Sequence, residues 1–272
     1  MEDRIKVDLK DGVADVRLVR TDKMNALDDH MFQALIDTGE DLKTRPGVRA
    51  IVLSGEGKAF CAGLDMGNFG KMASGERSGG QSSTGEALLT PKRTPGGSNR
   101  AQHAVMVWRE QTVPVIAAIH GVAFGGGFQL ALGADLRFVT PDTRMAVMEI
   151  KWGLVPDMGG LVLMKRLVRD DVARELTYTG RIFDGEEALR LGFATRVCAD
   201  PRAEALALAA EIASKSPDAI RGSKRLLDMA YDADQHAMLL AESQEQGALI
   251  GSPNQIEAVM SNMQKRAAVY AD

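Results

Sequence analysis

The sequence predicts a layered α/β body followed by a purely helical region. Over about the first 200 residues, short apolar runs bounded by turn residues alternate with segments of helical spacing. Over residues 202–270 the pattern is helical throughout. The 272 residues fit one large domain, or a domain with an extension. We therefore expect an α/β core over residues 1–200 and a helical region over residues 201–272.

The chain is expected to begin with a hairpin and a crossover. Apolar and polar residues alternate on both sides of Asp11-Gly12, a dipeptide typical of hairpin turns. A helix should follow, with Asn25 or Asp28 as its N-cap and Pro46-Gly47 at its end. The apolar run Val48–Leu53 predicts a buried strand. Because this strand is reached through a helix, we expect parallel pairing and a right-handed crossover.

Residues 67–100 interrupt this alternation. The stretch is rich in Gly, Ser, Thr and Pro, which indicates a long loop. It directly follows a predicted turn, so we expect it to cover a substrate. A surface insertion without a role has the same composition. A helix over about residues 101–110 leads back to the core.

The stretch from Ala117 to Asp135 contains the first candidate for a functional site. The apolar run Val115–Ile119 predicts a buried strand, and three glycines at 125–127 lead into a segment of helical spacing. A strand, a turn without side chains and a helix start leave backbone N–H groups pointing outward, where they can bind an anion or a developing oxyanion. Close backbone packing also requires glycine. Both interpretations are open at this point.

A second stretch of the same kind lies earlier in the chain. Lys58–Met66, with the sequence KAFCAGLDM, follows the strand at 48–53 and is rich in small residues. Two such turns can supply two N–H donors to one carbonyl oxygen.

The elements after the glycine turn are expected to be short. They are strands at 136–138, 145–147 and 193–197, a helix after Gly159-Gly160 and a helix at 186–191. The second of these strands has Glu149 at its exit, which places a carboxylate at the end of an apolar segment.

Four motifs follow one another along the chain: KMNAL at 23–27, AFCAGLD at 59–65, HGVAFGGG at 120–127 and GLVPDMGG at 153–160. In combination they resemble the crotonase superfamily, the enoyl-CoA hydratases and isomerases. The resemblance covers about the first 200 residues and reappears near the end. It implies a crotonase-like spiral of ββα units. It also implies a C-terminal helical region that builds a homotrimer, often paired into a homohexamer.

The same resemblance implies an enzyme that acts on an acyl-CoA thioester, with coenzyme A as part of the substrate and no further cofactor. Removing a proton beside a thioester carbonyl creates an enolate. N–H donors aimed at the enolate oxygen lower the barrier, and one donor is worth roughly 2.7–4 kcal/mol. By resemblance, the donors here are the backbone N–H groups of Leu64 and Gly126.

The acid/base groups depart from the hydratase pattern. The hydratases place and activate water with two glutamates, the first in the pattern GGGCE. Here the matching residue is Gln129, whose amide can orient a water or a substrate oxygen but cannot shuttle a proton. The second glutamate matches Glu149, which can act as acid or base. We therefore expect double-bond isomerisation, with hydration as a close alternative and a non-catalytic CoA-binding scaffold as a third.

Asp157 is a further catalytic candidate. It lies where the dienoyl-CoA isomerases of the superfamily carry an aspartate, and it could act as a second proton carrier. It could equally cap the helix expected to start near Gly159. With Asp157 and a water held by Gln129, Glu149 could also support slow hydration.

By resemblance, coenzyme A lies along the turns at 22–26 and 61–66. Besides the two oxyanion donors, the residues expected to border or contact it are Lys23, Met24, Ala26, Ala62, Asp65 and Met66.

Composition narrows the partners and the compartment. A net charge of −4 argues against nucleic acid or an anionic membrane as the main partner. No apolar run is long enough to span a bilayer, and the charged, alternating N-terminus is unlike a targeting peptide. The two cysteines and four histidines lack metal-ligand spacing. We therefore expect a cytoplasmic protein without a metal site.

Overall fold

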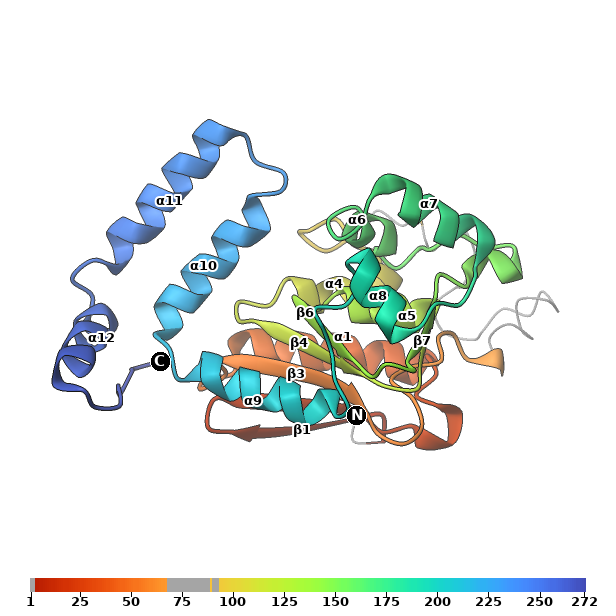
Figure 1. The fold of residues 1–272 in the computed structure, drawn as a ribbon, viewed down its shortest axis with the longest axis horizontal. Coiled ribbons are helices and arrows are strands. Elements are labelled where there is room, and N and C mark those ends of the chain that lie inside the picture. The colour runs from red at the N-terminus through yellow and green to blue at the C-terminus, as the bar shows by residue number, and fades with distance from the viewer. Residues whose placement is uncertain (1–2, 68–88, 90–92) are drawn as a thin grey trace.

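The computed structural model describes residues 3–67, 89 and 93–272. Its largest element is a six-stranded sheet with the order β1-β2-β3-β4-β6-β8, in the middle of Figure 1. The strands are β1 (Ile5–Lys10), β2 (Val13–Leu18), β3 (Ala50–Gly55), β4 (Val115–Ile119), β6 (Leu136–Val139) and β8 (Arg196–Val197). The first two strands pair antiparallel and all later neighbours pair in parallel. The predicted hairpin and parallel crossover are confirmed.

The two faces of the sheet are covered by separate hydrophobic layers. On β3, Ile51 and Leu53 belong to the main core, whereas Ala50 and Val52 belong to a second cluster on the opposite face. The helices α1 (Asp29–Thr44) and α4 (Arg100–Arg109) contribute to the main core and pack against each other. The second cluster lies beneath α9 (Pro201–Ala213), which presents three alanines at four-residue spacing to the sheet.

Side-chain caps fix the starts of α1 and α4. Asp28 precedes α1 and accepts a hydrogen bond from the Met31 N–H at 2.8 Å, so Asp28 is the N-cap and Asn25 is not. Asn25 instead adopts a left-handed backbone conformation with φ 56°. Asn99 and Gln102 form a capping box at the start of α4.

A small parallel sheet brings two parts of the candidate site together. It consists of β5 (Val122–Phe124) and β7 (Arg144–Ala146). The helix α5 (Gly126–Leu132) starts shortly after β5, and the 3₁₀ helix η2 (Glu149–Trp152) follows shortly after β7. Because the two strands run in parallel, their carboxyl ends meet at one edge, next to the start of α5 and to Glu149. β5 was not predicted, since three residues are too few to show a period.

The later helices fall into two groups (Figure 1). One group covers the end of the body near the small sheet: α6 (Gly160–Met164), α7 (Asp170–Thr179) and α8 (Gly185–Leu191). The other group extends away from the sheet: α10 (Pro217–Met229), α11 (Gln235–Leu249) and α12 (Pro253–Gln264). Although α9 follows the predicted boundary at residue 201, it packs on the sheet. The helices that leave the body therefore start with α10, and the division into domains stays a prediction.

Most of the loop predicted at 67–100 lies outside the described residues. Its last part, residues 93–99, leads into α4, which starts one residue before the helix expected there. Among the helices of the described residues, none combines the length and the apolar character that crossing a bilayer requires.

Candidate active site

The two glycine-containing bends are adjacent. Cys61 forms a parallel bridge with Ala123, and the Cys61 oxygen accepts a hydrogen bond from the Phe124 N–H at 3.2 Å. A side-chain carbon on Gly63 would lie 2.5 Å from the Phe124 oxygen and 3.7 Å from the Gly126 nitrogen. Glycine with φ 89° therefore allows the two backbones to approach this closely.

A short backbone ladder sets the direction of the Leu64 N–H. Leu27 donates to the Gly63 oxygen at 2.8 Å and accepts from the Asp65 N–H at 3.0 Å. Both bonds involve residues that flank Leu64, so the N–H of Leu64 itself points to the opposite side of the ladder. That N–H donates no hydrogen bond to any residue that the structure describes.

The three glycines of the second bend serve different purposes. Gly126 is the first residue of α5, so its N–H has no partner within the helix, and it has none among the other described residues. Gly127 packs against the first bend, since a side-chain carbon there would lie 2.2 Å from the Cys61 oxygen. Close packing thus explains Gly127, and an open backbone donor is found at Gly126.

Glu149 lies beside this second bend. Its Oε1 atom lies 3.4 Å from the position that a Gly125 side-chain carbon would take, and it accepts a hydrogen bond from Gln129 Nε2 at 2.6 Å. Its Oε2 atom is buried and accepts no hydrogen bond from the described residues. Burial raises the pKa of the Glu149 carboxyl above its ordinary value, and the nearby charge of Asp157 adds to this. Hydrogen bonds from its own backbone N–H and from Gln129 oppose the shift.

The Gln129 side chain is buried, and both its oxygen and its nitrogen form hydrogen bonds within the protein. Its side chain is 1% exposed, and its oxygen accepts hydrogen bonds from the N–H groups of Met158 and Gly160, both at 2.9 Å. Its nitrogen donates to Glu149. This differs from the expectation that the Gln129 amide would orient a water or a substrate oxygen, because its oxygen already holds the start of α6.

Asp157 is an exposed residue of the segment that precedes α6. The start of α6 has Gly159 as its N-cap and no side-chain cap, so the predicted capping role of Asp157 is not found. The Gln129 oxygen instead receives the N–H of Gly160, the first residue of that helix. Although Asp157 reaches solvent, neighbouring protein atoms reduce its hydration and raise the pKa of its carboxyl. Asp157 therefore does not act as the cap of α6.

The two turns expected to border coenzyme A lie next to each other. The Ala62 N–H donates to the Met24 oxygen at 3.0 Å, so the turns around 24 and 62 lie together. Lys23, Met24 and Met66 are exposed, whereas Ala26 is buried. Ala26 and Asp65 have partners inside the protein: the Ala26 oxygen accepts from Arg20, and the Asp65 carboxylate pairs with the same arginine.

Two residues that shape the first bend were not predicted as site residues. Asn25 donates through Nδ2 to the oxygens of Glu56 and Ala59, at 3.1 and 2.9 Å, and so ties the turn before α1 to the loop after β3. Arg20 links that turn to Asp65. The signal for Asn25 was its preference for left-handed backbone, which its interpretation as a cap overlooked. No sequence signal identifies Arg20, because its partner lies far along the chain.

Comparisons with known proteins agree over nearly the whole chain. The family model described as Enoyl-CoA hydratase/isomerase matches residues 8–272. The mitochondrial Delta(3,5)-Delta(2,4)-dienoyl-CoA isomerase of Mus musculus is 32% identical over 258 residues, which cover 93% of this chain and 77% of that protein. The peroxisomal protein of the same name from Arabidopsis thaliana is 30% identical over 256 residues, covering 93% and 90%. The crystal structure of an enoyl-CoA hydratase from Bacillus anthracis matches with a TM-score of 0.85 at 27% identity, covering 98% of both chains.

Proposed function

The chain belongs to the enoyl-CoA hydratase/isomerase family, and on this premise we propose that it moves a carbon–carbon double bond within an unsaturated acyl-CoA thioester. In the proposed reaction, Glu149 removes a proton from the carbon next to the thioester carbonyl. The electron pair of that C–H bond spreads into an enolate. When the proton is returned further along the acyl chain, the double bond is left one position closer to the thioester.

The proposed enolate needs a partner for its negative oxygen. The N–H groups of Leu64 and Gly126 suit this role, because they belong to adjacent bends and donate to no other described residue. Backbone donors fixed by the fold require no reorganisation during the reaction, and one such donor is worth roughly 2.7–4 kcal/mol.

The contacts of Gln129 and Glu149 are the observation that favours isomerisation over hydration. Gln129 is buried and engaged with Met158, Gly160 and Glu149, so it offers nothing with which to place a water. Glu149 keeps Oε2 free of described hydrogen-bond donors, and its raised pKa makes it a better base than an ordinary glutamate. One such carboxylate suffices to carry a proton from one carbon to another.

Asp157 favours a second candidate reaction, a proton shift across a conjugated diene. There the proton leaves the carbon next to the thioester and is returned at the far end of the diene, where a second acid is needed. The charge of Asp157 acts on Glu149, and its own pKa is raised. The names of the Mus musculus and Arabidopsis thaliana relatives point to the same substrate class.

Three substrates separate the alternatives: a 3-enoyl-CoA, a 3,5-dienoyl-CoA and a 2-enoyl-CoA. We expect conversion of the first or second, and we expect it to disappear in Glu149→Gln. If Asp157→Asn abolishes only diene conversion, Asp157 is the second proton carrier. Water addition to the 2-enoyl-CoA as the main reaction would contradict the proposal and favour a hydratase. Binding of coenzyme A without any conversion would favour a scaffold.

We further infer that coenzyme A binds along the exposed Lys23, Met24 and Met66. We also infer that copies of the chain associate through α10 to α12. Large apolar side chains of these helices are exposed, among them Leu227 at 73% and Met263 at 75%. A homotrimer or homohexamer would cover them, and light scattering would give its mass. The cytoplasmic location stays a prediction, and relatives from mitochondria and peroxisomes show that the family is not confined to one compartment.

A further inference from the structure

We propose that Arg20 is a positioning residue for catalysis: its guanidinium locks the turn before α1 to the Leu64 bend and thereby fixes the direction of the Leu64 N–H. Arg20 acts through the backbone of this bend. The inference rests on the proposed role of that N–H as a donor to the thioester oxygen.

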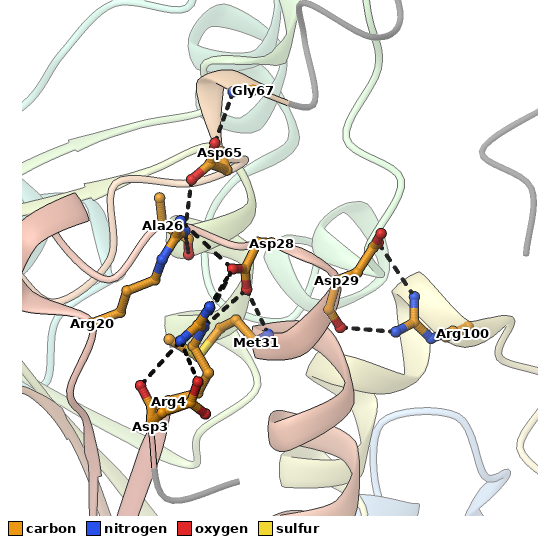
Figure 2. A network of polar contacts seen from close by, with 10 residues as sticks. All are labelled: Asp3, Arg4, Arg20, Ala26, Asp28, Asp29, Met31, Asp65, Gly67 and Arg100. Carbon is orange, nitrogen blue, oxygen red and sulfur yellow. Dashed lines mark hydrogen bonds and ion pairs between the residues drawn. The ribbon is translucent and has the colours of Figure 1, made fainter. Parts of the chain in front are cut away.

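Arg20 spans two segments that are distant in sequence, as Figure 2 shows. Its Nη1 atom donates to the Ala26 oxygen at 2.9 Å and lies 2.6 Å from Asp65 Oδ2. Ala26 belongs to the turn that precedes α1, and Asp65 directly follows Leu64. One guanidinium nitrogen therefore joins both sides of the ladder that orients the Leu64 N–H.

The ladder alone is a weak support. It consists of three backbone hydrogen bonds, from Ala62 to Met24, from Leu27 to Gly63 and from Asp65 to Leu27. Short pairs of segments are marginal by themselves, and their ends open first. The Arg20–Asp65 contact closes the ladder at the end next to Leu64.

The two carboxylates around Arg20 are themselves fixed. Asp65 Oδ1 accepts the Gly67 N–H at 2.7 Å. Asp28 Oδ2, 3.6 Å from Arg20 Nη2, accepts from Arg4 Nη2 at 2.8 Å. Both contacts are drawn in Figure 2. The carboxylates that contact the guanidinium are thus held in place by hydrogen bonds of their own, which restricts the positions that the guanidinium can take.

The Arg20–Asp65 ion pair is largely shielded from solvent, so its attraction can contribute to the stability of the bend. The two side chains are 14% and 17% exposed, whereas those of the Arg225–Glu245 pair between α10 and α11 are 58% and 22% exposed. Burial opposes the charge on Asp65, but the hydrogen bonds from the Gly67 N–H and from Arg20 outweigh it, so the pKa of this carboxyl lies below its ordinary value. The pair is therefore ionised at neutral pH and holds its geometry there.

The experiment compares Arg20→Gln with Arg17→Gln. Arg17 lies in β2, is 21% exposed and pairs with Glu56 at 3.0 Å, but contacts neither side of the ladder. It therefore matches Arg20 in charge and is close to it in exposure, at 21% against 14%. Each variant and the wild type are saturated with butyryl-CoA carrying an isotope label in its carbonyl, and the carbonyl stretching frequency is measured by infrared difference spectroscopy. Hydrogen bonds to the oxygen lower this frequency.

We expect the wild type and Arg17→Gln to lower the frequency equally, and Arg20→Gln to lower it clearly less. In turnover of the unsaturated substrate, kcat should fall about 10- to 100-fold in Arg20→Gln while KM changes little, because a misplaced donor is lost mainly in the transition state. Asp65→Asn, which keeps an acceptor for the Gly67 N–H, should give an intermediate loss and guards against misfolding of the arginine variant.

Equal carbonyl frequencies in the wild type and Arg20→Gln, with both variants folded by circular dichroism, would overturn the inference. So would equal losses in Arg20→Gln and Arg17→Gln, which would indicate a general structural role. Because butyryl-CoA is saturated, the spectrum is independent of the reaction type. A lowered frequency without isomerisation would contradict the proposed reaction and leave the role of Arg20 intact.

Discussion

The two halves of the proposed site are held by different kinds of contact. Glu149 is oriented by a neutral, buried amide, that of Gln129, at 2.6 Å. The Leu64 bend is held by opposite charges, those of Arg20 and Asp65, also at 2.6 Å but closer to solvent.

The difference follows from what each half must do. A cation beside Glu149 would stabilise its carboxylate, lower its pKa and make it a weaker base, whereas an amide fixes the carboxylate with a smaller effect. The backbone donors of the other half do not titrate. An ion pair behind them is therefore tolerated, because it changes the protonation of no donor. The proposed base therefore has a neutral support, and the proposed donor of the Leu64 bend has an ionic one.

The largest effect is expected from the neutral half. Glu149→Gln keeps an oxygen for the Gln129 N–H but removes the base, so turnover should fall by about 10²–10⁴-fold. Since burial raises the pKa of Glu149, its ionisation weakens the folded state as the pH rises through the unfolded and then the folded pKa. The variant lacks this cost, so its melting temperature at pH 7 should be no lower than that of the wild type. Substantial residual turnover would show that another group is the base.

Changing Gln129 tests whether the neutrality of this support matters. In Gln129→Glu an oxygen can still accept the N–H groups of Met158 and Gly160, but a second carboxyl now faces Glu149. The pair should share a proton, which raises the pKa of Glu149 further. Because the base must be ionised, the acid limb of the pH–rate profile should shift to higher pH. At slightly acid pH the activity should be on the order of tenfold lower than that of the wild type.

Gln129→Met is the matched control. It leaves two buried N–H groups without an acceptor and should cost about 1–3 kcal/mol for each in unfolding free energy. It adds no charge but removes the Gln129 hydrogen bond that lowers the pKa of Glu149, so the acid limb of its pH–rate profile should move upward less than that of Gln129→Glu. An equally large upward shift in both variants would show that loss of the Gln129 amide, rather than the second carboxyl, controls the pKa of Glu149.

Much of the fold was readable because it depends on local patterns. Apolar runs identified β3 and β4, the family resemblance and both glycine bends were found from motifs, and Asp28 was among the two predicted caps. β5 was missed, yet its pairing with β7 brings α5 beside Glu149. Three residues carry too little pattern for prediction, so the element that assembles the base was invisible in the sequence.

The supports of the site were the least predictable part. Gln129 and Glu149 were both singled out, but their mutual contact depends on the pairing of β5 and β7. Arg20 is one charged residue among many, and it acquires a role only when the bend at Asp65 folds against it. Side-chain contacts between distant segments depend on tertiary structure, which propensity and periodicity do not describe.

The ionic half should be sensitive to acid in a way that the neutral half is not. The pKa of Asp65 is depressed below its ordinary 3.8, so its contribution to stability is complete above that value and is lost as the pH falls through the lower, folded-state pKa. Asp65→Asn should therefore be less stable than the wild type by about 1 kcal/mol at pH 7. Urea unfolding should show this difference shrinking below about pH 4. A difference that is independent of pH would mean that the charge of Asp65 does not support the bend.

The smallest effect, and the most selective, should come from salt. At about 1 M ionic strength the screening length is about 3 Å, so the Arg20–Asp65 attraction weakens, although the low exposure of the pair limits the loss. We expect kcat at saturating substrate to fall about twofold in the wild type and to stay constant in Arg20→Gln, which has no pair to screen. KM is unsuitable for this test, because salt also weakens binding of the anionic coenzyme A. The acid limb set by Glu149 should hardly move, since its support is a neutral amide. The same salt dependence of kcat in both proteins would show that the ionic half does not act through Arg20.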